Sequence, residues 1–137
     1  MIGIILCCHA DMGQGMKSAA ELIIGPQENF TALGINPGEG IDDLKKQLKK
    51  TIRKIGKEGT LILTDLPGGT PFNVSAMIMN DNVKMISGFN LPLLIKILMD
   101  RHSVSNLDKL VEGAPQYAAE HVIDAHALLN KNEGSIA

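Results

Sequence analysis

The sequence predicts an α/β fold: a doubly wound, mostly parallel sheet with helices on both faces. Four short apolar runs alternate with amphipathic stretches, the order expected of consecutive strand–helix–strand units. Apolar residues make up 45% of the chain and aromatic residues only 3%, which favours aliphatic packing of helices on a sheet. We expect the strand order 2-1-3-4, with room for an antiparallel edge strand near the C-terminus.

One domain accounts for nearly all of the chain. The length of 137 residues fits a single domain of ordinary size, and neither a repeat nor a linker interrupts it. We assign residues 1–129 to this domain and residues 130–137 to a polar C-terminal tail, expected to fray.

The expected elements begin with a continuous apolar run over residues 2–8, typical of a parallel strand covered on both faces. Residues 14–24 predict a helix that ends at Gly25-Pro26, and residues 30–35 a second strand. The clearest helix covers 41–55, where apolar residues recur every three or four positions. The remaining expected elements are strands over 60–64 and 83–88, helices over 71–80 and from Leu91, and two helical pieces within 107–129 that bend at Gly113 and Pro115.

A histidine and an aspartate follow two strands that this order makes neighbours. His9 ends the first strand and Asp65 follows the third. In an open parallel sheet, ligands bind beyond the carboxyl ends of the strands where the strand order reverses, here between these two. A carboxylate bonded to one ring nitrogen fixes the tautomer and leaves the other nitrogen as a nucleophile. A lone histidine would more simply be a strand-end residue bonded to a carbonyl group, but the pair favours function.

The loop PGGTPFN after Asp65 predicts an anion site. Gly68 and Gly69 allow the backbone to approach a ligand, Thr70 is expected to cap the next helix, and Pro71 suits its first position. Free amides at such a helix start suit a phosphoryl group. A capped turn without a ligand remains the alternative. The loop is not a nucleotide-binding P-loop, because no Gly-Lys-Ser/Thr follows.

The stretch CCHA at positions 7–10 raises the alternative of a metal site. Alternate strand residues point to opposite faces, so Cys7 and His9 can share a side while Cys8 cannot, and no second Cys/His pair has zinc spacing. We therefore expect no metal, and treat both cysteines as small buried side chains. Asp11 is either a helix cap or a second carboxylate. The glycine spacing in HADMGQG does not match a dinucleotide-binding loop, and no cofactor is expected.

The net charge bears on the partners of the protein, and the N-terminal residues bear on its cellular compartment. A net charge of −2 gives no reason to expect nucleic-acid binding. The apolar start lacks a basic flank and is too short for a signal peptide or a membrane span, which predicts a cytoplasmic protein not inserted in a membrane. Adjacent free cysteines fit a reducing compartment. The lysine-rich stretch 45–57 reads as a solvated helix face or a weak docking surface for an acidic partner.

Together these motifs resemble the enzyme IIA domains of the mannose family of the sugar phosphotransferase system. The shared pieces span nearly the whole chain. They are the apolar strand with H-x-x-x-x-x-G (His9 to Gly15), G-x-x-E-N (Gly25 to Asn29), P-G-E (Pro37 to Glu39), L-x-D-x-x-G-G-[ST]-P-F-N (Leu63 to Asn73) and G-x-N-x-P-x-L (Gly88 to Leu94).

The resemblance implies a phosphoryl carrier. His9 would accept a phosphoryl group from the phosphohistidine protein HPr and pass it to a histidine of enzyme IIB. From enzyme IIB the group would reach the sugar that enters through the membrane components IIC/IID. The chain itself would associate with these components only peripherally. Asp65 would orient His9, and the loop with Gly68, Gly69 and Thr70 would stabilise the phosphoryl oxygens. Members of the family are homodimers in which the two subunits exchange a C-terminal strand. Many members have Gly where this chain has Ala10, a small change, and some continue into a IIB domain, whereas we expect a free-standing IIA here.

Three other interpretations stay open at the level of sequence. One is the related phosphoryl donor of dihydroxyacetone kinases that depend on the phosphotransferase system, although PFN after GGT favours the sugar-transport branch. Another is a regulatory module phosphorylated only as a signal. The third is a flavodoxin-like protein that binds a small ligand without phosphoryl transfer.

Overall fold

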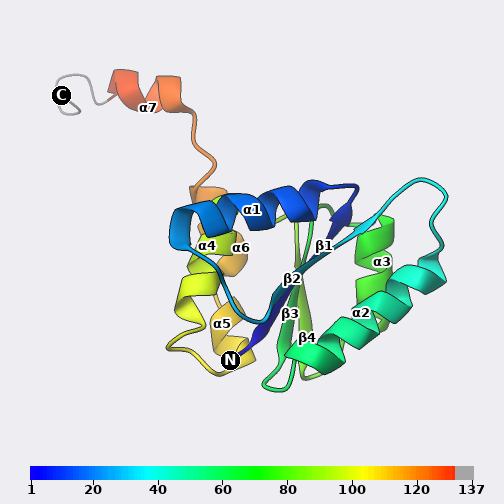
Figure 1. Cartoon of the computed structure of the whole chain (residues 1–137). Helices are drawn as coiled ribbons and strands as arrows, with labels where there is room; N and C mark the ends of the chain where they lie inside the picture. Colours follow the sequence, from blue (N-terminus) through cyan, green and yellow to red (C-terminus); the bar gives the residue numbers. More distant parts are fainter. Residues whose placement is uncertain (132–137) are drawn as a thin grey trace.

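In the computed structural model, residues 1–131 are described and form a sheet of four parallel strands with helices on both faces (Figure 1). The strand order is β2-β1-β3-β4, which confirms the predicted 2-1-3-4 arrangement. An antiparallel edge strand is not found within residues 1–131, and residues 132–137 of the expected tail lie outside the described part. The strands are β1 (Gly3–His9), β2 (Phe30–Ile35), β3 (Thr60–Thr64) and β4 (Val83–Ser87).

Seven helices connect and follow these strands in the described part of the chain. None of them is long and apolar enough to cross a membrane. They are α1 (Met12–Ile24), α2 (Ile41–Ile55), α3 (Thr70–Met77), α4 (Leu91–Asp100), α5 (Leu107–Val111), α6 (Ala114–Glu120) and α7 (Ala125–Lys131).

The sheet separates two hydrophobic cores, and β1 supplies residues to both. Leu6 and Cys8 face the core shared with α1, α4, α5 and α6, whereas Ile5 and Cys7 face the core shared with α2 and α3. All four side chains are fully buried, as expected for a central strand whose successive residues alternate between two covered faces. The apolar run at the start of the sequence is therefore continuous because both faces of this strand are buried.

The helical parts depart from expectation in three places. Helix α3 ends at Met77, three residues before the predicted end, because the chain turns there into a bridge between Asn80 and Val83 that starts β4. The C-terminal segment forms three helices where two were expected. Gly113, with φ of 71°, adopts the left-handed conformation just before α6. Helix α7 runs to Lys131, past the predicted start of the tail at residue 130.

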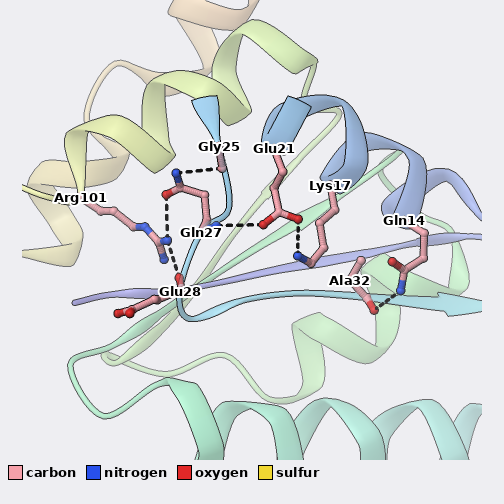
Figure 2. A network of polar contacts seen from close by, with 8 residues as sticks. All are labelled: Gln14, Lys17, Glu21, Gly25, Gln27, Glu28, Ala32 and Arg101. Atoms are coloured by element: carbon pink, nitrogen blue, oxygen red, sulfur yellow. Dashed lines mark hydrogen bonds and ion pairs between the residues drawn. The ribbon is translucent and has the colours of Figure 1, made fainter. Parts of the chain in front are cut away.

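A buried arginine joins the end of α4 to the loop that leads into β2 (Figure 2). Arg101 is only 3% exposed, and its guanidinium donates to the carbonyl oxygens of Ile2 and Asn29, both at 3.0 Å, and to that of Glu28. It also contacts the side-chain oxygen of Gln27 at 3.4 Å. One side chain thereby satisfies several main-chain acceptors beside the central strands, a task suited to the planar fork of arginine.

Replacing Arg101 by methionine should lower the free energy of unfolding by about 2–4 kcal/mol, because buried carbonyl groups would lose their donors. Arg101→Lys should recover only part of the loss, since a single ammonium cannot reach all of these acceptors. Urea unfolding of both variants tests this, with exposed Lys109→Met as the control, for which we expect a change below about 0.5 kcal/mol. Equal stabilities for Arg101→Met and the wild type would contradict the structural role.

Candidate functional site

His9 and Asp65 meet at the carboxyl edge of the sheet, where β1 and β3 end side by side. The ring Nδ1 of His9 lies 2.8 Å from Oδ2 of Asp65, and the backbone N–H of His9 donates to the same oxygen at 2.9 Å. The His9 side chain remains 44% exposed while that of Asp65 is 6% exposed. The carboxylate is thus an internal support, and the hydrogen bond at Nδ1 leaves the other ring nitrogen of the half-exposed imidazole, Nε2, for a ligand.

The environment of Asp65 favours its ionised form. Burial raises the pKa of this carboxyl, but the hydrogen bonds from the backbone and ring of His9 outweigh burial and hold the pKa below its ordinary value. A carboxylate can only accept a hydrogen bond, so Nδ1 carries the proton when the ring is neutral. The lone pair of the neutral ring then lies on Nε2.

Gly69 leaves the space that the imidazole ring occupies. A Cβ atom added at this position would lie 2.6 Å from Cε1 of His9 and 3.1 Å from Nε2, which is closer than real contacts allow. The predicted loop therefore approaches the histidine directly, and its backbone lies at the exposed side of the ring. Any larger residue at position 69 would displace the imidazole.

The predicted role of Thr70 as the helix cap is wrong. Gly69 is the N-cap of α3, Thr70 is the first helical residue, and no side chain caps the amides of the first turn. The reason is steric: the cap position lies against His9, where only glycine fits. Pro71 follows in the first turn, and Gly68 adopts a φ of 85° that glycine accommodates readily. The uncapped amides of Thr70 and Phe72 are therefore available to an anion at the end of the helix.

The turn after His9 depends on a glycine that sequence reasoning missed. Ala10 has a left-handed φ of 49°, and its N–H donates to the carbonyl of Ile35 at 2.9 Å. A Cβ atom on Gly34 would lie 2.3 Å from the carbonyl oxygen of Ala10. A glycine inside a strand often marks such a close backbone approach, and this signal was present in the sequence of the second strand.

The other residues considered from sequence do not join the site. Asp11 is the N-cap of α1, but its side chain makes no capping hydrogen bond. Cys7 and Cys8 are buried on opposite faces of the sheet. Within residues 1–131, the acidic, histidine and cysteine side chains form no group of three or more that could hold a metal ion.

Both cysteine thiols should be unreactive in the folded protein. Burial, reinforced for both by the nearby charge of Asp65, raises the pKa of Cys7 to about 11 and that of Cys8 to about 12. Only about one thiol in a thousand or fewer is then ionised at pH 8, and neither is exposed. We expect negligible reaction with a thiol reagent such as DTNB at pH 8, and rapid reaction of two thiols in denaturant. Rapid labelling of the native protein would contradict this burial.

A half-exposed histidine with a fixed tautomer, beside an uncapped helix start, is suited to carry an anionic group. The buried carboxylate would balance the positive charge that the ring gains when Nε2 forms a fourth bond. Nucleophilic transfer of a phosphoryl group needs little more than such positioning and charge stabilisation.

Comparison with known proteins identifies the family. Residues 3–114 match the family model EIIA-man, described as the PTS system fructose IIA component, where PTS denotes the sugar phosphotransferase system. The chain belongs to this family. It is therefore a phosphotransferase component, an EIIA of the group that includes mannose, fructose and sorbose systems.

Named relatives of this EIIA cover it almost completely. The fructose-specific EIIA component of Bacillus subtilis is 30% identical over 131 residues, which are 89% of this chain and 90% of that protein. The mannose-specific EIIAB component of Escherichia coli K12 is 32% identical over 124 residues, 88% of this chain but only 38% of that longer protein. The chain thus matches a little over a third of the EIIAB component.

Solved structures agree with the fold. The EIIA component from Streptococcus agalactiae superposes with a TM-score of 0.85 at 33% identity, covering 93% of this chain and 99% of that one. The IIA protein associated with a fucose utilization operon of Streptococcus pneumoniae gives a TM-score of 0.81 at 30% identity, covering 93% and 96%.

Proposed function

We propose that this EIIA carries a phosphoryl group on His9, which it receives from phospho-HPr and passes to a histidine of enzyme IIB. The observation that carries the proposal is the pair of hydrogen bonds from His9 to one oxygen of Asp65, which leaves Nε2 of a half-exposed ring as the nucleophilic nitrogen. The named relatives, which are fructose, mannose and sorbose components, support the sugar-transport branch.

In the proposed reaction, the Nε2 lone pair of His9 attacks the phosphorus atom of phosphohistidine on HPr. The new N–P bond forms as the donor's N–P bond breaks, and that electron pair returns to the donor imidazole. The His9 ring becomes cationic and keeps its Nδ1–H bonded to Asp65, whose negative charge stabilises it. Transfer to enzyme IIB repeats the same exchange with His9 as the donor.

The loop of Gly68, Gly69 and Thr70 would hold the phosphoryl oxygens. Gly69 brings the uncapped start of α3 against the exposed side of the ring. Its amides and the positive end of the helix dipole suit a group with about two negative charges. The protein's own dipoles supply this stabilisation, so the proposal needs no metal or other cofactor.

Exposed apolar side chains flank the site and would contact both protein partners. Met12 lies three residues after His9 and is 42% exposed, and Leu66 follows Asp65 and is 48% exposed. Methionine is enriched at protein interfaces, and exposed apolar side chains beside a reactive group offer a surface for a protein partner. The same surface would serve HPr and enzyme IIB in turn.

The direct test is phosphorylation with phosphoenolpyruvate, enzyme I and HPr, followed by intact mass measurement. We expect one added phosphoryl group, stable in base and lost in acid, that passes to the IIB component of a mannose-family system. Labelling without transfer to any IIB would favour a regulatory module. Failure to label, together with binding of flavin or nucleotide, would contradict the proposal.

Gly69→Ala should slow phosphorylation about tenfold or more while changing stability little. The added methyl group would push against Cε1 and Nε2 of His9, and the half-exposed ring can swing aside more readily than the backbone. Labelling by phospho-HPr and thermal unfolding should be measured on the same preparation.

Gly68→Ala is the matched control for this substitution. A Cβ atom there meets nothing within 4 Å, but the φ of 85° is unfavourable for alanine. We expect a stability loss of about 1 kcal/mol, with phosphorylation less affected than in Gly69→Ala. The reverse order of the two labelling rates would contradict the contact between Gly69 and the ring.

The chain is further proposed to be a cytoplasmic, single-domain homodimer that associates with the membrane components only through its partners. Helix α7 follows an extended segment and stands apart from the sandwich (Figure 1). Four apolar side chains of this region are exposed: Val122, Ile123, Leu128 and Leu129. Such a surface is typical of residues covered by a second subunit. Sedimentation of the purified protein should give the dimer mass.

A further inference from the structure

A basic groove lies between α2 and α3. Figure 1 shows these two helices on the same face of the sheet. The groove encloses about 310 Å³. Its apolar part is formed by Ile52, Met77, Ile78 and Val83, of which Met77 is 61% exposed. Its polar part is Lys45, Lys49, Arg53 and Asn80.

The three cations lie on one side of α2 at intervals of four residues. Lys45, Lys49 and Arg53 therefore form a row along the groove, and no carboxylate lines it. Within residues 1–131, none of the three takes part in an ion pair. Like charges at this spacing destabilise a helix, so an anionic partner would relieve a repulsion that the fold itself leaves in place.

The charge is also concentrated in this part of the chain. Residues 41–57 hold seven of the thirteen lysine and arginine residues but only two acidic ones, although the whole chain is slightly negative. The potential over α2 is therefore positive on a protein whose remainder is acidic, which favours approach of a negative partner to this face.

We infer that the groove binds an extended acidic segment of a partner protein, with glutamate or aspartate at alternate positions and apolar residues between them. Cations four residues apart on a helix are about 6 Å apart along its axis, and alternate side chains of an extended chain are about 6.6 Å apart. Carboxylates at alternate positions thus match the row on α2. The intervening side chains point the other way, towards Met77 and Ile78.

The groove is remote from His9. Val83 is level with Gly3 through their common neighbour Thr60, and His9 lies six residues further along β1. At about 3.3 Å per residue this places the floor of the groove about 20 Å from the histidine along the strands. Met77, on the other wall of the groove, lies eight residues after the helix cap Gly69, about 12 Å along α3. A segment in the groove would therefore leave the phosphorylation site open.

The test is fluorescence anisotropy with the full chain and a fluorescein-labelled peptide, Glu-Leu-Glu-Leu-Glu, in low salt. We expect saturable binding that weakens as salt rises. Lys49→Glu should weaken it about tenfold or more, because one attraction becomes a repulsion. Met77→Ala, at an exposed position, should weaken it by a smaller factor through lost apolar contact. Phosphorylation of both variants by phospho-HPr should equal that of the wild type.

Lys50→Glu is the matched control, since Lys50 is exposed on α2 but does not line the groove. Equal loss of binding in Lys50→Glu and Lys49→Glu, no binding at all, or equal binding of Gln-Leu-Gln-Leu-Gln would overturn the inference. So would competition by inorganic tripolyphosphate at the affinity of the peptide, which would indicate a small polyanion. A change of sedimentation mass in Lys49→Glu would identify a second copy as the occupant instead.

Discussion

Replacement of His9 by alanine is expected to abolish phosphorylation by phospho-HPr, so that no residual rate can be detected. The variant should fold normally, because the His9 side chain is 44% exposed at the end of its strand. Its removal takes away the only atom of the proposed site that can form the N–P bond. Intact mass after incubation with enzyme I, HPr and phosphoenolpyruvate measures the outcome directly.

His102→Ala serves as the control for this loss. His102 is exposed after α4 and belongs to no part of the proposed site, so its replacement should leave phosphorylation unchanged. If the His9 variant still accepted the label at the rate of the wild type while the His102 variant did not, the assignment of the phosphorylated residue would be wrong.

Asp65→Asn is expected to slow phosphoryl transfer by up to about 10⁴-fold in both directions, the loss seen in a serine-protease triad when the carboxylate that fixes the histidine tautomer is replaced by its amide. The amide can donate a hydrogen bond to Nδ1, which favours the tautomer with the proton on Nε2 and removes the nucleophilic lone pair. It also fails to balance the charge of the phosphorylated ring. Rapid-quench labelling by phospho-HPr, and discharge to enzyme IIB, measure both directions.

Asp11→Asn separates this effect from a general loss of negative charge near the histidine. Asp11 is exposed two residues after His9, and no hydrogen bond joins its side chain to the ring. We expect its replacement to change the transfer rate less than threefold. Similar losses in the two variants would show that Asp65 acts through charge at a distance and not through the tautomer.

Asp65 should also make stability depend on pH in a defined direction. Its pKa in the folded protein lies below the ordinary carboxyl value of about 3.9, so the stabilisation it gives is complete above that value. The stabilisation is lost as the pH falls through the lower folded pKa. The difference in unfolding free energy between the wild type and Asp65→Asn should therefore shrink as the solution becomes strongly acid.

The strands and their order could be predicted because each rests on a local pattern. The residues of β1 are apolar on both faces, which predicts a strand buried on two sides. The apolar residues of α2 recur at helical spacing, which predicts a helix buried on one side. The adjacency of His9 and Asp65 followed from strand order alone. A glycine inside the second strand, Gly34, also indicates a close backbone approach, but the sequence does not show that the approaching segment is the turn at Ala10.

Two of the failures share a physical cause, which is contact between segments distant in sequence, and the third is a local turn. Thr70 has a good capping side chain, yet Gly69 takes the cap because His9 fills the space beside it. Helix α3 stops early because Asn80 pairs with Val83. The role of Arg101 could not be predicted either, since its acceptors lie more than seventy residues away along the chain.

The sequence by itself determined the order of strands and helices, the two cores and the carboxyl edge at which a site would form, because these follow from apolar periodicity and the handedness of strand–helix–strand units. Only the tertiary structure decided which nitrogen of His9 is free, that Asp65 receives both the ring and the main chain of His9, and that Gly69 lies against the imidazole. These features depend on distances of about 3 Å between separate strands and loops, and local sequence patterns do not encode such distances.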